Sequence, residues 1–471
     1  MTVNHIHSLL ESNRTEELEL VLETLTKKLV AYSKWASSDE GVVGKFVDPQ
    51  VLSKELSLKF VDEGEGSEGL FEDVDLLLDN SVVTWNQGFL DKLYASTNPV
   101  GIASDMLLSI LNTNSHVFTV SPALTIIEQR TAREYARLFG FRGPKPGGLT
   151  FPGGSYSNMT SMHVARSILY PETKLHGNGS HKFAVFTSAH GHYSVEKSAI
   201  MLGLGSESLF KVKVSPDGRM IPAELENAIN QAKAKGYTPF YVNATAGSTV
   251  YGSFDDFEAI SRIAKAHGLW MHVDGSWGAN VVFSKTQRHK LKGAELADSL
   301  TVNPHKMLGV PTTCSFLLVP DTKTLQIANS LQAPYLFHSS HDGDEYFDLA
   351  DATMGCGRRP DALKLYLAWH WYGTQGFGDR IDHAFDLTKY LAERVKLNPN
   401  LILVSEFPPP CLQTCFYYAP GGKLPQDEKE VSRITRYIVG ELQKRGTFLI
   451  DYAPNSSGSG EFFRVVINSP M

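Results

Sequence analysis

Strand and helix patterns alternate along the sequence from about residue 100 to residue 320. Short apolar runs bounded by Gly, Pro, Asn or Asp predict buried strands: KFAVFTS, LFKVKV, TPFYVNATA, GLWMHVDGS, SLTVNP and TCSFLLVP. Segments with apolar residues at three-to-four spacing predict helices between several of them: SVEKSAIMLGL, PAELENAINQAKAKG and DFEAISRIAKAHG. This order predicts an α/β fold with a mostly parallel central sheet and helices on both faces. Ligands of such sheets bind at the carboxyl ends of the strands.

The chain has 471 residues, which is longer than a usual single domain. Residues 1–95 are mostly helical in pattern, residues 96–375 hold the alternating block, and residues 376–471 predict a small α+β domain. Its expected strands are LILVSE, QTCFYYA, TFLIDYA and FFRVVIN. We therefore expect a helical N-terminal segment, a large domain and a small C-terminal domain.

Charge and hydropathy exclude several classes of protein. The net charge is -7, so nothing suggests a nucleic-acid footprint. The first residues have no basic segment followed by an apolar one, and no later stretch is apolar enough to span a bilayer. Four cysteines are too few for a disulfide scaffold in a chain of this length, and buried reduced thiols are expected. A cytoplasmic location is the default expectation.

Two opposite charges stand at the ends of apolar runs. Lys306 follows SLTVNP, and Asp274 ends the run in WMHVDGSWG. Desolvation disfavours both charges, and strand ends of one parallel sheet face the same crevice. The two groups could pair as a structural ion pair. Alternatively, they could both serve pyridoxal phosphate, which takes a lysine as Schiff base and an acid as the partner of its pyridine nitrogen.

A Gly-Gly-Ser turn and an HxH motif lie on the same block. Gly153 and Gly154 would let the backbone approach a phosphate before a helix N-terminus, although such a turn is also a common loop. The sequence lacks the GxGxxG and Walker spacings there. His190 and His192 could be half of a metal site, but no convincing third ligand motif accompanies them, and no metal is expected. A ring stacked on a planar cofactor suits His192 better, and a helix-capping histidine is the plain alternative.

Taken in order, these segments resemble the pyridoxal-phosphate-dependent group II amino-acid decarboxylases, and more narrowly their glutamate and cysteine-sulfinate branch. The resemblance covers about residue 40 to the end. It is carried by GGSYSNMTSMHVAR, FTSAHGHYSVEKSA, GRMIPAELE, NATAGSTVYGSFDDF, WMHVDGSWG, NPHKMLGVPTTCSFLLV, CGRRPDALKLYLAW and FFRVVIN. It implies fold type I of the pyridoxal-phosphate enzymes and a homodimer with its sites at the interface.

The resemblance also implies roles for individual residues. Lys306 corresponds to the Schiff-base lysine, Asp274 to the pyridinium partner and His192 to the ring-stacking residue. Thr249 corresponds to a position beside the cofactor face. Ser155, Ser157, Ser299 and His305 correspond to positions that contact the cofactor's phosphate. Gly357, in the CGRR motif, corresponds to a position that could reach the phosphate bound by the partner subunit.

Fewer residues bear on the proton donor and the substrate. The family carries a tyrosine on a mobile loop, to which Tyr346 or Phe347 corresponds here; both could instead simply anchor the loop. Arg464 matches an arginine that binds a substrate carboxylate, although an arginine in a half-buried strand also commonly pairs with an acid. Lys92 could meet a distal acid group or point to solvent.

Three functions follow as hypotheses. The first is α-decarboxylation of a small acidic L-amino acid: glutamate, aspartate or cysteine sulfinate. The second is a decarboxylase or aldehyde-forming enzyme for an aromatic or specialised-metabolism amino acid, which the segment VSPALTIIEQ favours. The third is a catalytically silent binding or structural member of the family, against which the presence of Lys306, Asp274 and His192 argues.

Overall fold

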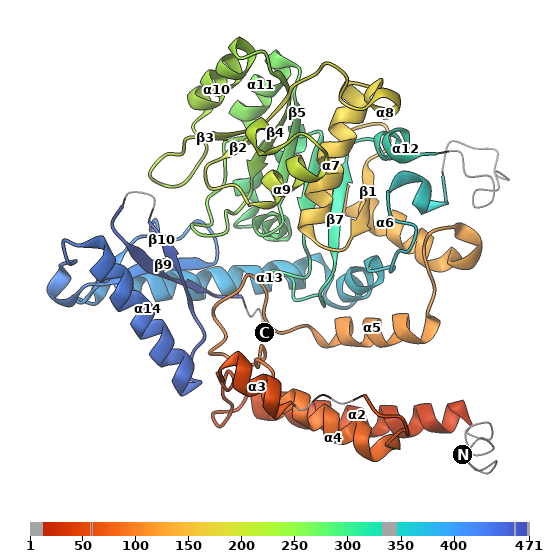
Figure 1. Cartoon of the computed structure of the whole chain (residues 1–471), viewed down its shortest axis with the longest axis vertical. Coiled ribbons are helices and arrows are strands. Elements are labelled where there is room, and N and C mark those ends of the chain that lie inside the picture. Colours follow the sequence, from red (N-terminus) through yellow and green to blue (C-terminus); the bar gives the residue numbers. More distant parts are fainter. Residues whose placement is uncertain (1–12, 57, 59, 332–345, 456–457, 469–471) are drawn as a thin grey trace.

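The computed structural model describes residues 13–56, 58, 60–331, 346–455 and 458–468. Its centre is a seven-stranded sheet in the order β1-β7-β6-β5-β4-β2-β3 (Figure 1). The strands are β1 (Gly147–Phe151), β2 (Phe183–Ser188), β3 (Leu209–Val212), β4 (Thr238–Thr245), β5 (Trp270–Gly275), β6 (Ser299–Val302) and β7 (Ser315–Val319). Strands β2 to β6 pair in parallel, while β7 runs antiparallel between β1 and β6. The mostly parallel sheet expected from the sequence is confirmed.

Helices cover both faces of this sheet because successive side chains of a strand point to opposite sides. In β2, Ala184 and Phe186 pack with one set of helices, and Phe183 and Val185 pack with the other. The first set contains α6 (Pro122–Phe139), α10 (Pro222–Ala234), α11 (Phe257–His267) and α13 (Ala362–Leu397). The second contains α7 (Gly154–Leu169), α9 (Ser194–Met201) and α12 (Lys323–Asn329).

Local sequence signals explain where helices such as α11 begin and end. The side chain of Asp256 accepts a hydrogen bond from the backbone N–H of Ala259 and caps the first turn. Gly268 ends the helix with a φ of 67°, a conformation that glycine adopts without steric cost. The predicted helix DFEAISRIAKAHG therefore matches the observed one.

The N-terminal part of the chain is helical. It forms α2 (Arg14–Ala36), α3 (Pro49–Glu55), α4 (Gly66–Asn80) and α5 (Pro99–Leu111). Figure 1 shows α2, α3 and α4 together at the end of the molecule opposite α10 and α11. An ion pair of 2.6 Å between Lys28 and Asp75 joins α2 to α4. Within the described residues, no helix is both long and apolar enough to cross a membrane.

The C-terminal part pairs a helix with a second, antiparallel sheet. That sheet has the order β10-β11-β9-β8, formed by β8 (Leu401–Leu403), β9 (Gln413–Tyr418), β10 (Asp451–Pro454) and β11 (Glu461–Val466). The helix is α14 (Glu428–Arg445). Helix α13 crosses the predicted boundary at residues 375 and 376 and bends at Gly373, whose φ is 69°. The exact division into domains stays a prediction.

Candidate active site

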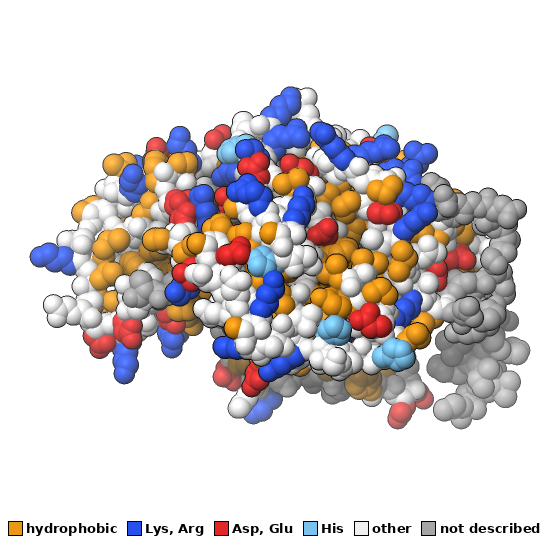
Figure 2. Space-filling view, turned by 90° about the horizontal axis from the view of Figure 1, so that it is seen from above, with side chains coloured by type: hydrophobic (Ala, Val, Ile, Leu, Met, Phe, Trp, Pro, Cys, Tyr) orange, Lys and Arg blue, Asp and Glu red, His pale blue; other side chains and the backbone are white. Residues whose placement is uncertain are grey.

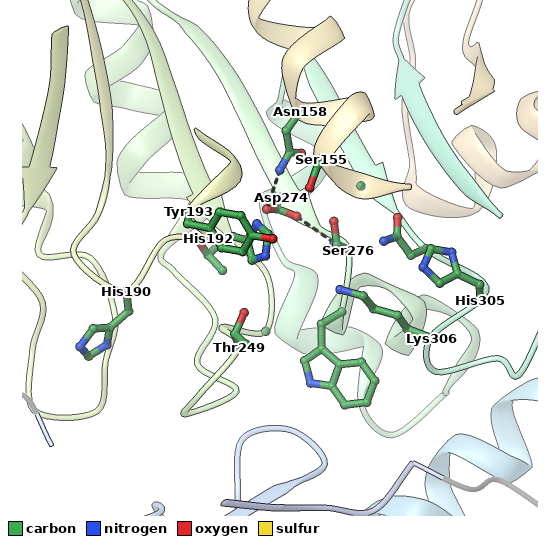
Figure 3. Close-up of a pocket in the computed structure, with 15 residues that line it drawn as sticks. Ser155, Asn158, His190, His192, Tyr193, Thr249, Asp274, Ser276, His305 and Lys306 are labelled. Atoms are coloured by element: carbon green, nitrogen blue, oxygen red, sulfur yellow. Dashed lines mark hydrogen bonds between the residues drawn. The ribbon is translucent and has the colours of Figure 1, made fainter. Parts of the chain in front are cut away.

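One cavity lies at the carboxyl ends of β5 and β6 and is lined by half of the predicted site residues (Figure 3). Its volume is about 210 Å³. Lys306, Asp274, His192, Thr249, Ser155 and His305 all line it, although they come from separate segments of the chain. The strand order explains this, because β4, β5 and β6 are parallel neighbours whose carboxyl ends share one edge.

The N-terminus of α7 forms one wall of the cavity. Gly153 precedes the helix with a φ of 105°, and Gly154 lies so close to the opposite wall that a Cβ there would overlap the Ser276 hydroxyl. That Cβ would also lie 2.9 Å from Nδ2 of Asn303. The unpaired backbone N–H groups of a helix N-terminus favour an anion, so this wall suits a phosphate.

Asp274, at the end of β5, is a buried carboxylate with a defined set of donors. Its Oδ1 accepts from the backbone N–H of Ser276 at 3.1 Å, and its Oδ2 accepts from Nδ2 of Asn158 at 2.8 Å. Burial by itself raises the pKa of Asp274, but nearby His192, the Ser276 hydrogen bond, and then His272 and Lys306 together hold that pKa below its ordinary value. The carboxyl group therefore stays ionised at neutral pH.

Lys306 lies in the turn after β6, with its amine directed into the cavity (Figure 3). Its backbone N–H donates to the carbonyl of Asn303 at 3.1 Å, which fixes the turn. Burial lowers the pKa of the Lys306 amine, and the attraction of Asp274 only partly opposes this. Among the residues that the structure describes, no ion pair joins Lys306 to Asp274. Both groups remain available to a molecule in the cavity.

The two histidines of the HxH motif have different surroundings. Nδ1 of His192 lies 2.8 Å from the hydroxyl of Ser194 and accepts the backbone N–H of Ser194 at 3.2 Å, so the ring proton belongs on Nε2. Burial lowers the pKa of His192, which keeps the ring neutral. The ring of His190 instead stacks on Tyr251 with centroids 5.0 Å apart. Figure 3 shows His190 well away from His192.

Three of the residues predicted to contact a phosphate, Ser157, Ser299 and Gly357, do not line the cavity. Ser157 is buried beside Ser315, with 2.9 Å between their hydroxyl oxygens. The hydroxyl of Ser299 is buried within the sheet, where it lies 2.8 Å from Nδ1 of His272 and accepts from Nε1 of Trp270 at 2.8 Å. Gly357 is exposed at the molecular surface and does not line the cavity. The roles expected for these three residues stay predictions.

Tyr346 and Phe347 also lie outside the lining. Tyr346 borders a second cavity, and its carbonyl accepts from Nε2 of Gln129 at 2.7 Å. Burial raises the pKa of its phenol. The ring of Phe347 packs against Phe118 with centroids 5.4 Å apart. Residues 332–345, which include the first part of the expected loop, lie outside the described residues, so the proton-donor assignment stays a prediction.

Arg464 and Lys92 meet at one carboxylate. Asp451 accepts from Arg464 at 2.8 Å and from Lys92 at 3.1 Å. Arg464 also donates to the carbonyls of Thr249, at 3.1 Å, and of Asp91, at 3.0 Å. Its Nε is buried without a hydrogen-bond partner. The guanidinium therefore lies directly behind Thr249, which lines the cavity, and keeps one donor unused.

Sequence reasoning missed several residues of the cavity wall, including Asn158, Ser276, Trp277 and Asn303. Each lies within three residues of a predicted site residue, which was the only available signal. Thr245 also lines the cavity, and its buried hydroxyl has no partner. Together, an unpaired amine, an ionised carboxylate, a neutral imidazole, a free hydroxyl and a helix N-terminus fit a planar pyridine aldehyde with a phosphate arm.

Comparisons with known proteins agree with this chemistry. Residues 49–419 match the pyridoxal-dependent decarboxylase conserved domain. The chain is 52% identical over 421 residues to an L-aspartate decarboxylase of Metarhizium robertsii, covering 89% of this chain and 83% of that protein. It is 37% identical over 448 residues to the cysteine sulfinic acid decarboxylase of Mus musculus, covering 94% and 90%.

Solved structures give the same result. The crystal structure of mouse CSAD aligns with a TM-score of 0.89 at 35% identity, over 96% of this chain and 95% of that one. An Oryza sativa TDC with PLP and tryptamine aligns with a TM-score of 0.86 at 22% identity, over 100% and 95%, which shows the shared fold alone. The chain therefore belongs to the pyridoxal-dependent decarboxylase family, and the fold, enzyme class and pyridoxal phosphate cofactor expected from its motifs are confirmed.

Proposed function

We propose that this decarboxylase removes the α-carboxylate of a small acidic L-amino acid, with L-aspartate as the preferred substrate. The observation that carries the chemistry is the pair of Lys306 and Asp274, which face one cavity without pairing with each other. The choice of substrate is supported by the 52% identity to an L-aspartate decarboxylase over most of the chain.

The proposed roles follow from the charges around the cavity. When bound, pyridoxal phosphate supplies an electron sink for the bond that breaks at the substrate's α-carbon. Lys306, with its lowered pKa, is a neutral amine in a larger fraction of molecules than an exposed lysine would be, and it would hold the cofactor through its aldehyde carbon, whose oxygen would leave as water. Asp274 stays ionised and holds a proton on the pyridine nitrogen. His192 would cover one face of the ring, and the N-terminus of α7, with Ser155 and His305, would hold the phosphate.

The acidic substrate needs cations beyond Lys306. We assign this part to Arg464, whose Nε has no partner and whose guanidinium lies behind Thr249. Asp451 holds that guanidinium in place from the other side. Lys92 shares Asp451 and adds positive charge to the same cluster.

We also propose that the chain works as a cytoplasmic homodimer. Helix α5 exposes a row of apolar side chains at Ile102, Met106, Leu107, Ile110 and Leu111. A contiguous apolar face of this kind is typical of a protein–protein interface. By contrast, the face of the molecule in Figure 2 carries acidic and basic side chains interspersed with apolar ones.

A substrate panel tests the proposed function. The purified protein with pyridoxal phosphate is given L-aspartate, L-glutamate, L-cysteine sulfinate, L-tyrosine and L-tryptophan in separate reactions, and CO2 and the organic product are identified. We expect L-aspartate to give β-alanine and CO2 at the highest kcat/KM. An aromatic amine or aldehyde as the main product would support the alternative hypothesis instead, and the absence of any turnover would support a silent member.

A lysine variant tests the site in the same assay. We expect Lys306→Ala to lower kcat by at least about a thousandfold, because no other described amine lines the cavity. Lys389→Ala, at an exposed position of α13, is the matched control and should retain full activity. Equal activity of the two variants would refute the assignment of Lys306.

A further inference from the structure

A chain of buried hydrogen bonds runs from Asp274 into the sheet, away from the cavity. Nδ2 of Asn158 donates to Oδ2 of Asp274 at 2.8 Å, and Oδ1 of Asn158 lies 3.1 Å from Nε2 of His272. On the other side of the ring, Nδ1 of His272 lies 2.8 Å from the hydroxyl of Ser299. That hydroxyl accepts from Nε1 of Trp270 at 2.8 Å. Asn158, His272 and Ser299 are each at most 2% exposed.

Both ends of this chain have a fixed hydrogen-bonding sense. The indole N–H of Trp270 can only donate, and the ionised carboxylate of Asp274 can only accept. Ser299 therefore accepts from Trp270 and donates to Nδ1 of His272, which leaves the ring proton on Nε2. His272 then donates to Oδ1 of Asn158, and the amide of Asn158 must turn its Nδ2 toward Asp274. Each group thus sets the orientation of the next.

His272 keeps this sense over the physiological pH range. Burial lowers the pKa of His272 to about 4, although nearby Asp274 opposes the shift. The ring is therefore neutral and carries a single N–H. The hydroxyl of Thr301, 3.3 Å from Nε2, is a second polar group on the same side of the ring.

The same amide also connects to the ring-stacking histidine. Nδ2 of Asn158 lies 3.0 Å from the hydroxyl of Ser194, which in turn lies 2.8 Å from Nδ1 of His192. One side chain thus links the carboxylate proposed for the pyridine nitrogen and the imidazole proposed for the ring face. A change in the orientation of the Asn158 amide would therefore disturb both Asp274 and His192.

We propose that His272, oriented by Ser299, is a positioning residue that directs the Asn158 amide onto Asp274 and so fixes that carboxylate toward the pyridine nitrogen of the cofactor. The inference deepens the proposed function, since it rests on Asp274 as the partner of that nitrogen. His272 does not line the cavity and acts only through Asn158.

Cofactor binding to Ser299→Ala, Ser299→Thr and His272→Phe tests this inference. Ser299→Ala removes the donor to Nδ1, and we expect the dissociation constant for pyridoxal phosphate to rise about three- to tenfold, as for one lost buried hydrogen bond. His272→Phe should raise it further. Ser299→Thr keeps the hydroxyl and should bind as the natural protein does. Ser104→Ala, a buried serine of α5 outside the chain of bonds, is the matched control.

A spectroscopic readout separates positioning from mere stability. With cofactor labelled with 15N at the ring nitrogen, the pH at which its chemical shift reports loss of the ring proton should fall in Ser299→Ala and His272→Phe, but not in Ser299→Thr or Ser104→Ala. Unchanged affinity and an unchanged titration in Ser299→Ala would overturn the inference, even if His272→Phe fails to fold. If the substrate panel showed that no acidic amino acid is decarboxylated, only the proposed function would be overturned. The inference about His272 would stand, because cofactor binding and the titration do not require turnover.

Discussion

Two histidines near the cofactor site, the buried His272 and the half-buried His305, make stability depend on pH. Burial lowers the pKa of both His272 and His305 to about 4. An unfolded chain takes up protons on histidine near pH 6.5, whereas these two folded side chains stay neutral. Stability is therefore lost as the pH falls from about 6.5 toward 4, by up to about 1.4 kcal/mol per pH unit for each residue. We expect urea midpoints to decrease between pH 7 and pH 5.

The buried carboxyl group of Asp255 opposes this loss of stability at low pH, and a variant at this position serves as the control. Burial raises the pKa of Asp255 to about 6, although it accepts the backbone N–H groups of Met220 and Thr245. The folded state binds a proton there before the unfolded state does, which adds stability as the pH falls from about 6 toward 4. In Asp255→Asn, the urea midpoint should therefore decrease more steeply as the pH falls. Midpoints independent of pH in both proteins would contradict these assignments.

Single residues were predictable where the chain itself marks them. Asp274 and Lys306 could be found because the first stands at the end of an apolar strand and the second just after one, and the ends of parallel strands meet at one edge. Ser299 could not be placed, because it lies on a strand whose four residues are all buried, and only the packed sheet shows which side chains reach the cavity. The contact of Arg464 with Asp451 likewise depends on strand register, since the two residues are direct partners of β11 and β10.

At the scale of elements, periodicity predicted most strands and helices of the large sheet. Strand β1 was missed because its sequence, GGLTF, lies between Pro-Gly pairs that read as a loop. Helix α13 continues through a bend at Gly373, so that a single element crosses the boundary expected between the large and the small domain. The strand order was not predictable from local sequence, because each crossover is decided by packing between segments far apart in the chain.

The N-terminus of α7 gives a prediction at this scale. Gly154→Ala would introduce a Cβ that overlaps the Ser276 hydroxyl and crowds Asn303, so the wall that faces the phosphate must shift. We expect the dissociation constant for pyridoxal phosphate to rise at least about tenfold, as measured by titration of the cofactor-free protein. Gly440→Ala, in open space within α14, is the control: it should leave cofactor affinity unchanged and stabilise the protein by about 0.5–1 kcal/mol. Equal cofactor affinity in both variants would mean that the phosphate binds elsewhere.

At the scale of the whole molecule, the loop before α13 contacts the wall of the proposed site. This loop holds Gly357, for which a role at the partner's phosphate is expected in the proposed dimer. Arg358, next to the exposed Gly357, forms a buried ion pair with Glu128 at 2.5 Å and donates to the carbonyl of Thr150 at 3.2 Å. Thr150 lies on β1, which leads into the N-terminus of α7. Losing one partner of such a pair leaves a buried charge uncompensated, which costs about 3–5 kcal/mol. This ion pair therefore fixes the position of the surface segment at Gly357 relative to the turn between β1 and α7, which is proposed to bind the phosphate.

The exposed face of α5 allows the dimer itself to be tested. Ile110 is 59% exposed, and we expect Ile110→Lys to weaken dimerisation roughly a hundredfold, since a charged side chain would have to be buried in an apolar contact. Analytical ultracentrifugation across a concentration series measures this, and pyridoxal phosphate binding should weaken in parallel if the partner completes the site. Leu175→Lys, at an 83% exposed position beside the large sheet, is the matched control and should leave the dimer intact. Dimers of equal strength in both variants would exclude α5 from the interface, because a lysine that stays in water has no desolvation cost.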